Sequence, residues 1–539
     1  MKKFLSIVLT LALCLSVIGA AFADSEYDHV TAAADWSDHI VDGKTVIKVG
    51  IESDPGTLDP FTTGSANGKN ATIKSCVYQY LGMIQGVGGP LVGELAKAWT
   101  QVGPATYEIE LYDYIRDSAG NAITADDVVF CYTTAKETRA INNAKDIVAI
   151  EKIDDYKVKL QLSADQVTIF ERIMQSIPVV SQKSYEESGD NMAANLITSG
   201  PYKVIEWVPG SSLIIEKVED YWQTPEIAAT DINQSANVDR IEFYVTKEAS
   251  QMSVNLETGN FDMVYNLSST EAKRFFADGE SGAKFNLYTS LNNLTQTMFL
   301  NSSAKSPLGG SKELRQAVLY AIDAQAVMDG ASSGYGVVCK TFGSDRLGDF
   351  QAQWNDEPYY EYDPDKAMEL LKASGVDTST LSLRIVTNGT TMRNRIAQIV
   401  QGYLLAVGIK SEILPYDDTL FNTYKNENDQ WDLLLDNCGT SDLLMGMWRT
   451  KLSINCCSNG TAFMLQSEEL ESLLQAAASV ETNSPETVNA LHQYVKDGAY
   501  VYGLYNNLAF TVTTQVCTNV AFNSTPWMLP SASTFVWNN

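Results

Sequence analysis

The chain has 539 residues, of which 66 are acidic and 38 basic, so its formal net charge at pH 7 is −28. This excess of carboxylates argues against nucleic acid and anionic lipid as partners, because proteins bind both through clustered lysine and arginine side chains. The length is enough for about three domains, at roughly 100 to 200 residues per domain.

The first 23 residues have the pattern of a secretory signal peptide. Two lysines precede an apolar run over residues 4–18, and an Ala-Phe-Ala sequence precedes Asp24. The run is shorter than the roughly 20 apolar residues of a membrane-spanning helix, so it predicts an exported chain that begins at Asp24. Cys14 would be the lipid acceptor of a lipoprotein signal, but Leu13 stands where such signals carry a small residue. We therefore expect an unlipidated, extracytoplasmic protein.

The rest of the chain contains segments with the hydrophobic spacing of helices and segments with that of strands. Residues 24–43 are polar and acidic without periodicity, which predicts a flexible leader. Residues 365–373 and 395–406 carry apolar residues at helical spacing, and residues 313–328 also read as a helix. Other segments favour strands, namely residues 46–51, 107–111, 157–162, 240–245 and 381–386. Alternating strands and helices predict an α/β fold.

Residues 199–222 give the clearest local prediction, a β-hairpin. A Gly-Pro pair at 200–201 forms an entry turn, and residues 203–208 alternate apolar with polar. A Pro-Gly-Ser sequence at 209–211 reverses the chain, and residues 213–218 form the returning strand.

Cysteine and histidine usage gives no sign of a metal or redox site. Seven cysteines follow the predicted signal peptide, an odd number that cannot pair completely, and a chain of this length can bury a core without disulfides. We expect free buried thiols and no cofactor or metal. The three histidines are His29, His39 and His492, and no HExxH, P-loop or GxGxxG motif occurs.

The hairpin segment resembles the T-G-P-Y, P-G and D-Y-W segment of the extracytoplasmic solute-binding proteins of family 5, which serve ABC importers of peptides and nickel. Further motifs follow in the order of the family: LDP at residues 58–60, ELAKAW at 94–99, ITADDV at 123–128, LRQAVLYAID at 314–323 and YDPDKAMELL at 362–371. The resemblance covers about residues 46 to 510, nearly the whole exported chain.

The resemblance implies a two-lobed periplasmic-binding-protein fold of type II, cluster C, with an extra subdomain inserted in lobe one. Two strands would cross between the lobes, near residues 294–301 and 500–505. Carried onto this chain, lobe one comprises residues 44–75, 195–293 and 505–539, the inserted subdomain residues 76–194, and lobe two residues 294–504.

The same resemblance implies a function. The protein would capture a small solute, most readily a peptide, in the cleft between the lobes and would close on it by a hinge motion. It would then deliver the solute to permease subunits in the membrane, acting as a monomer in the periplasm or at the outer face of the cell membrane. It would catalyse no reaction. A receptor of the same fold for a nickel chelate, an oligosaccharide or another non-peptide solute is the alternative.

One segment indicates where the solute binds. Residues 431–442, WDLLLDNCGTSD, resemble the family's Y-D-x-x-x-x-G-W-x-x-D strand, whose last aspartate pairs with the α-ammonium of a peptide. This implies that Asp442 takes that role, with Cys438 and Gly439 beside the ligand. Cys438 stands where the family has tryptophan, and the acid comes one residue later than usual. Asp442 could instead be a loop acid or a helix cap.

Three further residues are candidates for the pocket. In dipeptide-binding relatives an arginine that clamps the ligand carboxylate follows a strand like residues 381–386, and here Asn388 lies at that place. Since the clamp is missing, a longer peptide or another solute is favoured over a free dipeptide. Trp448 and Tyr335 are candidate pocket aromatics, although either could belong to the core.

A secreted serine hydrolase is the alternative from another class. Residues 330–334 fit G-x-S-x-G around Ser332, and His492 could complete a triad. The motif functions on a sharp turn between a strand and a helix, whereas here it follows the predicted helix at 313–328. This context favours a loop at a helix end.

Overall fold

The computed structural model describes residues 39–63, 71–84, 88–138, 140–224, 238–275, 284–357, 359–440, 442–455, 467–515, 517–518 and 536–537. The predicted signal peptide and most of the predicted leader lie outside these ranges. The end of that leader forms β1 (Ile40–Val41), which pairs with β2 (Lys44–Ile51). Within the described ranges, no helix combines the length and the apolar character that crossing a bilayer requires.

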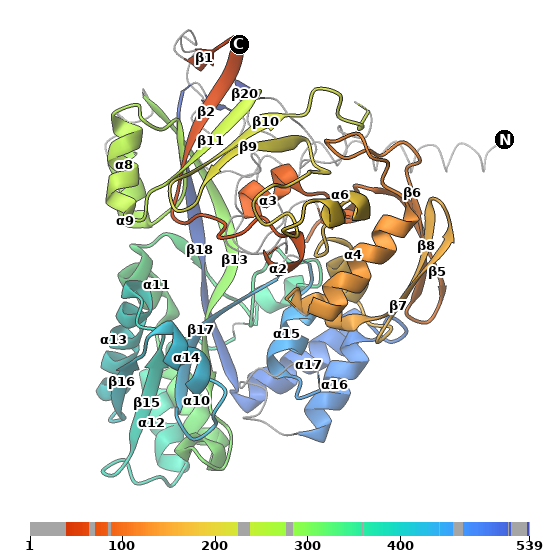
Figure 1. Ribbon diagram of the computed structural model, residues 1–539. Coiled ribbons are helices and arrows are strands. Elements are labelled where there is room, and N and C mark those ends of the chain that lie inside the picture. The colour runs from red at the N-terminus through yellow and green to blue at the C-terminus, as the bar shows by residue number, and fades with distance from the viewer. Residues whose placement is uncertain are drawn as a thin grey trace, which may run out of the picture.

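A single twelve-stranded mixed sheet runs through both lobes (Figure 1). Its strand order is β16-β15-β17-β13-β18-β12-β2-β11-β10-β9, with β1 beside β2 and β14 beside β18. The remaining strands of this sheet are β9 (Tyr202–Val208), β10 (Ser212–Lys217), β11 (Arg240–Val245), β12 (Met263–Leu267), β13 (Phe285–Leu300), β14 (Gly336–Val338), β15 (Ser382–Thr387), β16 (Lys410–Pro415), β17 (Leu433–Gly439) and β18 (Val501–Thr514).

The strands β13 and β18 connect the two lobes. Residues 285–291 of β13 pair with residues 508–514 of β18 in the upper lobe of Figure 1, and residues 294–300 pair with β17 in the lower lobe. A register shift between Leu291 and Thr295 separates the two parts of β13. The two-lobed α/β fold that the sequence predicts is confirmed.

The predicted hairpin is also confirmed, as β9 and β10. The two strands pair antiparallel around Gly210, which has a φ of +74° and open space beside it. Glycine adopts this left-handed conformation without steric cost. Leu213 and Ile215 of β10 point into the core, and the intervening residues do not.

The inserted subdomain contains a four-stranded sheet of order β5-β6-β8-β7 and a two-stranded β3-β4 sheet. α3 (Ala71–Val77) leads into it from lobe one, and its elements are β3 (Gly82–Ile84), β4 (Leu91–Gly93), β5 (Ala96–Gly103), β6 (Thr106–Leu111), α4 (Ala125–Thr138), η2 (Asn142–Asp146), β7 (Ile147–Asp154), β8 (Lys157–Leu162), α5 (Ile169–Met174) and α6 (Gln182–Glu187). Buried residues of this subdomain, such as Ile109 and Val158, belong to the same core cluster as Ile47 and Phe243 of the large sheet. The inserted subdomain therefore shares a continuous core with lobe one.

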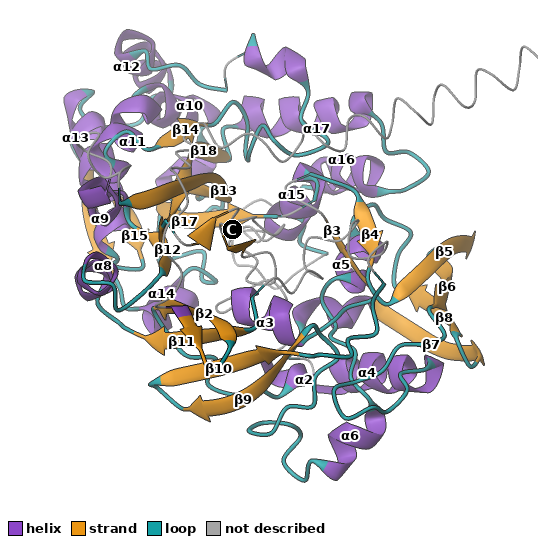
Figure 2. Cartoon of the chain, turned by 90° about the horizontal axis from the view of Figure 1, so that it is seen from above, coloured by secondary structure: helices purple, strands orange, loops and turns teal. Residues whose placement is uncertain are grey.

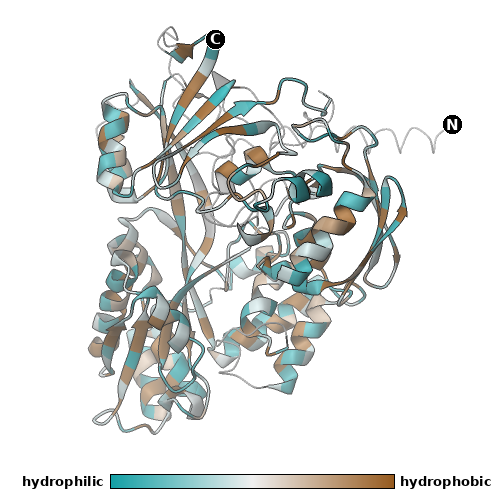
Figure 3. Cartoon of the chain, in the orientation of Figure 1, coloured by the Kyte–Doolittle hydropathy of each residue, from teal (hydrophilic) through white to brown (hydrophobic). Residues whose placement is uncertain are grey.

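Lobe two packs helices on both faces of the large sheet. Successive strand residues point to opposite faces, so Leu433 and Leu435 of β17 pack with α10, α11 and α13, whereas Leu434 and Cys438 pack with α15, α16 and α17. The helices are α10 (Lys312–Tyr320), α11 (Ala324–Ser332), α12 (Pro364–Ala373), α13 (Thr391–Ala406), α14 (Asp418–Tyr424), α15 (Leu444–Leu452), α16 (Glu468–Ala478) and α17 (Pro485–Gly498). Figure 3 shows the amphipathic character of these helices as mixed brown and teal.

The single helix expected at 313–328 is wrong, because the chain breaks there into α10 and α11. The side chain of Asp323 accepts a hydrogen bond from the backbone N–H of Ala326 and so begins a new helix. The predicted helices at 365–373 and 395–406 are confirmed as α12 and α13.

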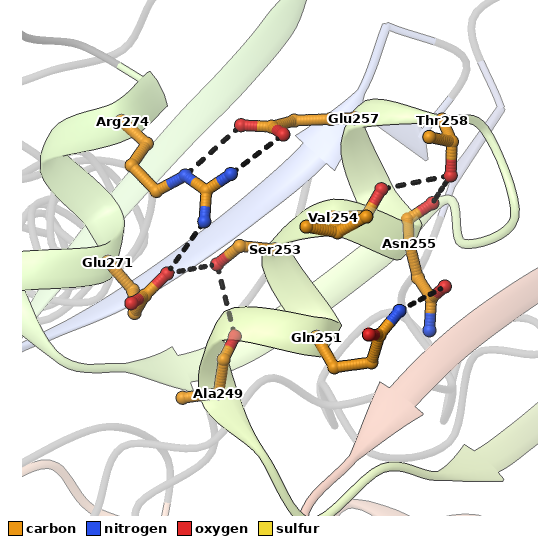
Figure 4. A network of polar contacts seen from close by, with 9 residues as sticks. All are labelled: Ala249, Gln251, Ser253, Val254, Asn255, Glu257, Thr258, Glu271 and Arg274. Atoms are coloured by element: carbon orange, nitrogen blue, oxygen red, sulfur yellow. Dashed lines mark hydrogen bonds and ion pairs between the residues drawn. The ribbon is translucent and has the colours of Figure 1, made fainter.

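Lobe one carries α8 (Ala249–Glu257), α9 (Ser269–Ala272) and η3 (Lys273–Phe275) on the sheet. Arg274 of η3 forms ion pairs with Glu257 and Glu271, and Ser253 donates to Glu271, as Figure 4 shows. These half-exposed pairs tie the three helices together. The short elements still to be named are α2 (Pro60–Thr63), η5 (Pro307–Gly310), η6 (Ala352–Asn355), β19 (Cys517–Thr518) and β20 (Val536–Trp537).

The thiols that the structure describes are free and buried, as expected: Cys76, Cys131, Cys339, Cys438 and Cys517. The predictions for Cys456 and Cys457 lie outside the described residues.

Candidate functional site

Asp442 lies between β17 and α15, where the chain passes from the sheet to the helix. Its side chain is buried, with a residue exposure of 4%. Thr440 donates its hydroxyl to one carboxylate oxygen, Oδ1, whereas the other, Oδ2, has no hydrogen-bond partner among the described residues. Burying a carboxylate oxygen without a donor is costly, so this position favours a ligand that brings donors and positive charge.

The alternative role of Asp442 as a helix cap is taken by another residue. Asp349 accepts hydrogen bonds from the N–H groups of Leu444 and Met445, the first residues of α15, at 2.7 and 2.9 Å. Burial raises the pKa of Asp349 to about 6, and the nearby negative charge of Asp442 acts in the same direction. Asp442 is thus not needed to cap α15.

The inserted subdomain brings two residues to the other side of Asp442. A Cβ added to Gly446 of α15 would lie 3.2 Å from Asp442 Oδ1 and 3.2 Å from Thr168 Oγ1, so Asp442 and Thr168 face the same point. Glu171, one turn further in α5, is close enough for the charge of Asp442 to raise its pKa, although burial is the larger cause. Acidic and hydroxyl groups from two parts of the molecule therefore meet at α15.

We call residues 165–168 the docking segment, because they attach the inserted subdomain to lobe two. The N–H of Val167 donates to the carbonyl of Ala478 at 2.8 Å, and the N–H of Val480 donates to the carbonyl of Asp165 at 3.1 Å. The side chain of Gln166 donates to Gln475 at 3.0 Å and accepts from Arg449 at 2.8 Å.

The docking segment follows one face of α15. Gly446 and Arg449 have the spacing i, i+3 on that helix, and Asp442, which precedes the helix, lies beside Gly446. Thr168 lies beside Asp442 and Gly446, and Gln166 bonds Arg449. The view from above in Figure 2 shows α5, which follows the docking segment, next to α15.

A pocket of about 660 Å³ opens at the same junction, without Asp442 in its lining. Gln166 and Arg449 border it together with residues of α16. The acid in its wall, Glu471, already accepts hydrogen bonds from Ser453, Asn455 and the N–H of Ile454.

Cys438 and Gly439 end the strand that leads to Asp442. Cys438 pairs with Thr295 of β13, and Gly439 pairs with Leu294. The thiol of Cys438 points into the lobe-two core, where burial raises its pKa to about 11. Both residues lie near Asp442 in sequence, and ligand contact by either stays a prediction.

The aromatic candidates lie in packed environments. Trp448 is buried, donates its indole N–H to the carbonyl of Phe342 and packs close to Trp354 and His492. Tyr335 packs edge-on against Phe510, at the junction of the lobes, with its ring beside Lys273. These contacts give both side chains packing partners within the protein, and their contact with a ligand stays a prediction.

Asn388 follows β15, as the sequence indicates, and donates to Asp418 at 3.2 Å. It also accepts a hydrogen bond from Thr390 at 3.2 Å. The structure therefore gives Asn388 partners within lobe two, away from the docking segment.

Asp436 lies on β17, six residues before Asp442, and basic side chains already compensate its charge. Arg393 lies 3.3 Å from one of its oxygens, and Lys425 and Lys451 each lie 4.0 Å from the other. Arg393, at the helix start after β15, is thereby held by Asp436. The ion pairs of the described residues do not include Asp442, so the described residues give it no cationic partner.

The hydrolase arrangement is not formed by the described residues. Ser332 is the last residue of α11, and its hydroxyl donates to the carbonyl of Met328 at 2.8 Å. His492 stacks on Trp354 with the ring centroids 4.2 Å apart, and neither ring nitrogen has a hydrogen-bond partner in that part of the chain. Nor do the described His, Cys, Asp and Glu side chains form a group of three or more that could hold a metal ion.

Sequence reasoning missed Thr168, Glu171 and Gly446. The glycine was a usable signal, because glycine inside a helix that begins directly after a candidate binding loop often marks close packing. Thr168 and Glu171 carry no signal in the sequence, since only the fold brings them to α15.

Residues 90–448 match the family described as bacterial extracellular solute-binding proteins, family 5 Middle. The oligopeptide-binding protein AppA of Bacillus subtilis is 23% identical over 338 residues, which are 57% of this chain and 58% of that relative. The matched region thus spans less than two thirds of that protein.

Solved structures share the fold. The substrate-binding protein CtaP of an ABC transporter of Listeria monocytogenes has a TM-score of 0.76 at 21% identity, covering 92% of this chain and all of that one. The oligopeptide-binding protein AppA of Bacillus subtilis, in complex with a nonapeptide, has a TM-score of 0.70 at 18% identity, covering 92% and 99%.

Proposed function

Since the chain belongs to the bacterial extracellular solute-binding proteins of family 5, we propose that it is the peptide receptor of an ABC importer and that Asp442 receives the amino end of the peptide. The protein would act as an exported monomer that closes its lobes on the peptide and passes it to the membrane permease. It would perform no catalysis of its own.

The observation that carries this proposal is the buried oxygen Oδ2 of Asp442, for which the described residues supply no donor. An α-ammonium has three N–H donors and a full positive charge, and it can form a short charge-assisted hydrogen bond with such an oxygen. A neutral sugar or an anionic metal chelate would leave the charge of Asp442 uncompensated. Relatives such as AppA of Bacillus subtilis are named as oligopeptide-binding proteins, which supports a peptide as the ligand.

The test is calorimetry with trialanine and pentaalanine, each as the free peptide and as the N-acetylated peptide. We expect the free peptides to bind and acetylation to abolish binding, since the acetyl group removes the positive charge. A charge-assisted hydrogen bond contributes about 1.5 to 3 kcal/mol, and a stranded buried charge costs about 3 to 5 kcal/mol. Asp442→Asn should therefore weaken binding about ten-fold to several thousand-fold.

Asp356→Asn is the matched control, because Asp356 is exposed and lies at the end of η6. It should bind the free peptides like the wild type. If acetylated peptides bind as well as free ones and Asp442→Asn changes nothing, the ligand is not held by a free amino end and the proposal fails.

A further inference from the structure

We infer that Thr168, in the inserted subdomain, is the second residue that binds the peptide's ammonium group, and that Gly446 keeps open the space between Thr168 and Asp442. This inference rests on the proposed function, because it assumes that Asp442 receives the amino end. It adds a binding residue from a part of the molecule that the sequence did not connect with the site.

Thr168 resembles Asp442 in having a buried polar atom without a partner. Its exposure is 2%, and Oγ1 forms no hydrogen bond with any described residue, Asp442 included. A hydroxyl can accept a hydrogen bond from a ligand and donate one in return. The two buried oxygens face one point and do not bond each other. A ligand group that donates to both from between them would account for this arrangement.

The upper limit on the separation of the two oxygens leaves room for an ammonium nitrogen. Thr168 Oγ1 and Asp442 Oδ2 lie 3.2 and 3.6 Å from the position of a Cβ on Gly446, so they are less than about 7 Å apart. A nitrogen that donates to both at about 2.8 Å needs oxygens about 4.5 to 5.6 Å apart. This span lies below the upper limit that the two distances set, and we infer that one ammonium bridges the oxygens.

Gly446 is the third residue of this proposed site. It is buried inside α15, where glycine is a poor helix former and alanine would be the better residue. An alanine methyl would lie in the space that both oxygens face. The preference for helix-forming residues does not explain this glycine, whereas the close approach of Thr168 and Asp442 to α15 does.

The backbone of Thr168 is strained in a way that holds its side chain at this point. Its φ of +73° lies in the left-handed region, which β-branched residues rarely adopt. Neighbouring contacts fix it there: the N–H of Val167 bonds Ala478, and the backbone N–H and Nε of Arg172 donate to the carbonyl of Thr168. Strain of this kind persists where surrounding structure determines it, and it clusters at ligand sites.

A pocket built in this way couples ligand capture to docking. Asp442 and Gly446 belong to lobe two, whereas Thr168 belongs to the inserted subdomain, which shares its core with lobe one. The pocket is complete only while the docking segment lies on α15. An ammonium bound there joins the two bodies directly.

The test uses calorimetry with trialanine on two pairs of variants. Thr168→Val removes the hydroxyl and keeps the branched shape, and it should weaken binding about ten- to hundred-fold. Thr168→Ser restores the hydroxyl and should bind within about three-fold of the wild type. A purely structural role of Thr168 would not distinguish valine from serine in this way.

Gly446→Ala should weaken binding at least about ten-fold, because its methyl group would lie 3.2 Å from Thr168 Oγ1 and from Asp442 Oδ1, and the melting temperature checks that the variant keeps its fold. Gly402→Ala is its control, because Gly402 lies inside α13 with no atom within 4 Å of an added Cβ. It should leave binding unchanged.

The outcomes separate the two proposals. If Asp442→Asn loses binding while Thr168→Val keeps it, the inference about Thr168 is overturned and the proposed function stands. Unchanged binding in Gly446→Ala would overturn the role given to that glycine. If neither Asp442→Asn nor acetylation of trialanine matters, the proposed function itself fails.

Discussion

Two neighbouring acids of β17 and its following loop have opposite electrostatic surroundings. Asp436 has three cations within 4.0 Å, and Asp442 has none among the described ion pairs. The first is a structural charge, since it compensates Arg393, whose side chain is 8% exposed. The second has no cationic partner among the described residues. The same residue type thus stabilises the fold at one position and, in the function that we propose, binds the ligand at the other.

Asp436→Asn should lower the stability of the protein by about 3 kcal/mol, because it leaves a buried arginine without its carboxylate. Urea unfolding followed by fluorescence measures this difference. The control is Arg274→Met, which breaks the half-exposed pairs of Figure 4 and should cost less than about 1 kcal/mol. Equal losses in the two variants would show that Asp436 is not a structural charge.

His492 makes stability depend on pH. Burial lowers its pKa from 6.5 to about 3, so the folded protein keeps it neutral where the unfolded chain takes up a proton. The contribution of His492 to the free energy of unfolding is therefore fully present above pH 6.5. It is lost as the pH falls toward 3, by up to about 1.4 kcal/mol per pH unit. Asp349 has the opposite effect on the free energy of unfolding. Because its pKa is raised to about 6, its contribution increases as the pH falls from about 6 to 4.

His492→Phe should flatten this dependence, since phenylalanine can stack on Trp354 without titrating. Melting temperatures of the variant and the wild type, measured from pH 7.5 to pH 4, give the comparison. The wild type should lose more stability than the variant over this range. Parallel curves would mean that His492 is protonated in the folded protein.

At the scale of elements, the sequence predicts those helices and strands whose formation depends on residues close together in the chain. The hairpin at 199–222 and the helix α12, begun by Asp363 and Pro364, follow from turn residues, caps and periodicity close together in the chain. The break between α10 and α11 does not follow from the helix predicted at 313–328, because it depends on the side chain of Asp323, which accepts a hydrogen bond from the N–H of Ala326.

The candidate site shows the same limit more sharply. The resemblance indicated Asp442, since its motif is contiguous in sequence. Thr168 could not be predicted, because its nearness to α15 depends on how the inserted subdomain packs on lobe two. A single sequence holds no local signal for such a contact.

At the scale of the whole molecule, the inserted subdomain is connected differently to the two lobes, and besides the docking segment its Gly88 lies against Arg346 of lobe two. It shares a hydrophobic core with lobe one, whereas the docking segment reaches lobe two through a short β-bridge, the side chain of Gln166 and the partly buried Val167. A shared core moves as one body, and a bridge of a few hydrogen bonds can open. We therefore expect lobe one and the subdomain to move together when the protein opens.

A disulfide across this bridge should lock the protein closed. Gln166 and Ser479 are paired residues of an antiparallel bridge, whose Cα separation of about 4.5 to 5.5 Å suits a disulfide. Oxidised Gln166→Cys, Ser479→Cys protein loaded with labelled trialanine should release it at least about ten-fold more slowly than the reduced protein. Equal release rates would show that the docking segment does not move when ligand leaves.

Native mass spectrometry of the protein purified from cells that express it tests the central claim most directly, because it identifies the solute that the protein itself selects. The account predicts a bound peptide with a free amino end, carried by the wild type and lost from Asp442→Asn. A bound solute without an amino group, or a peptide retained equally by Asp442→Asn, would contradict the account.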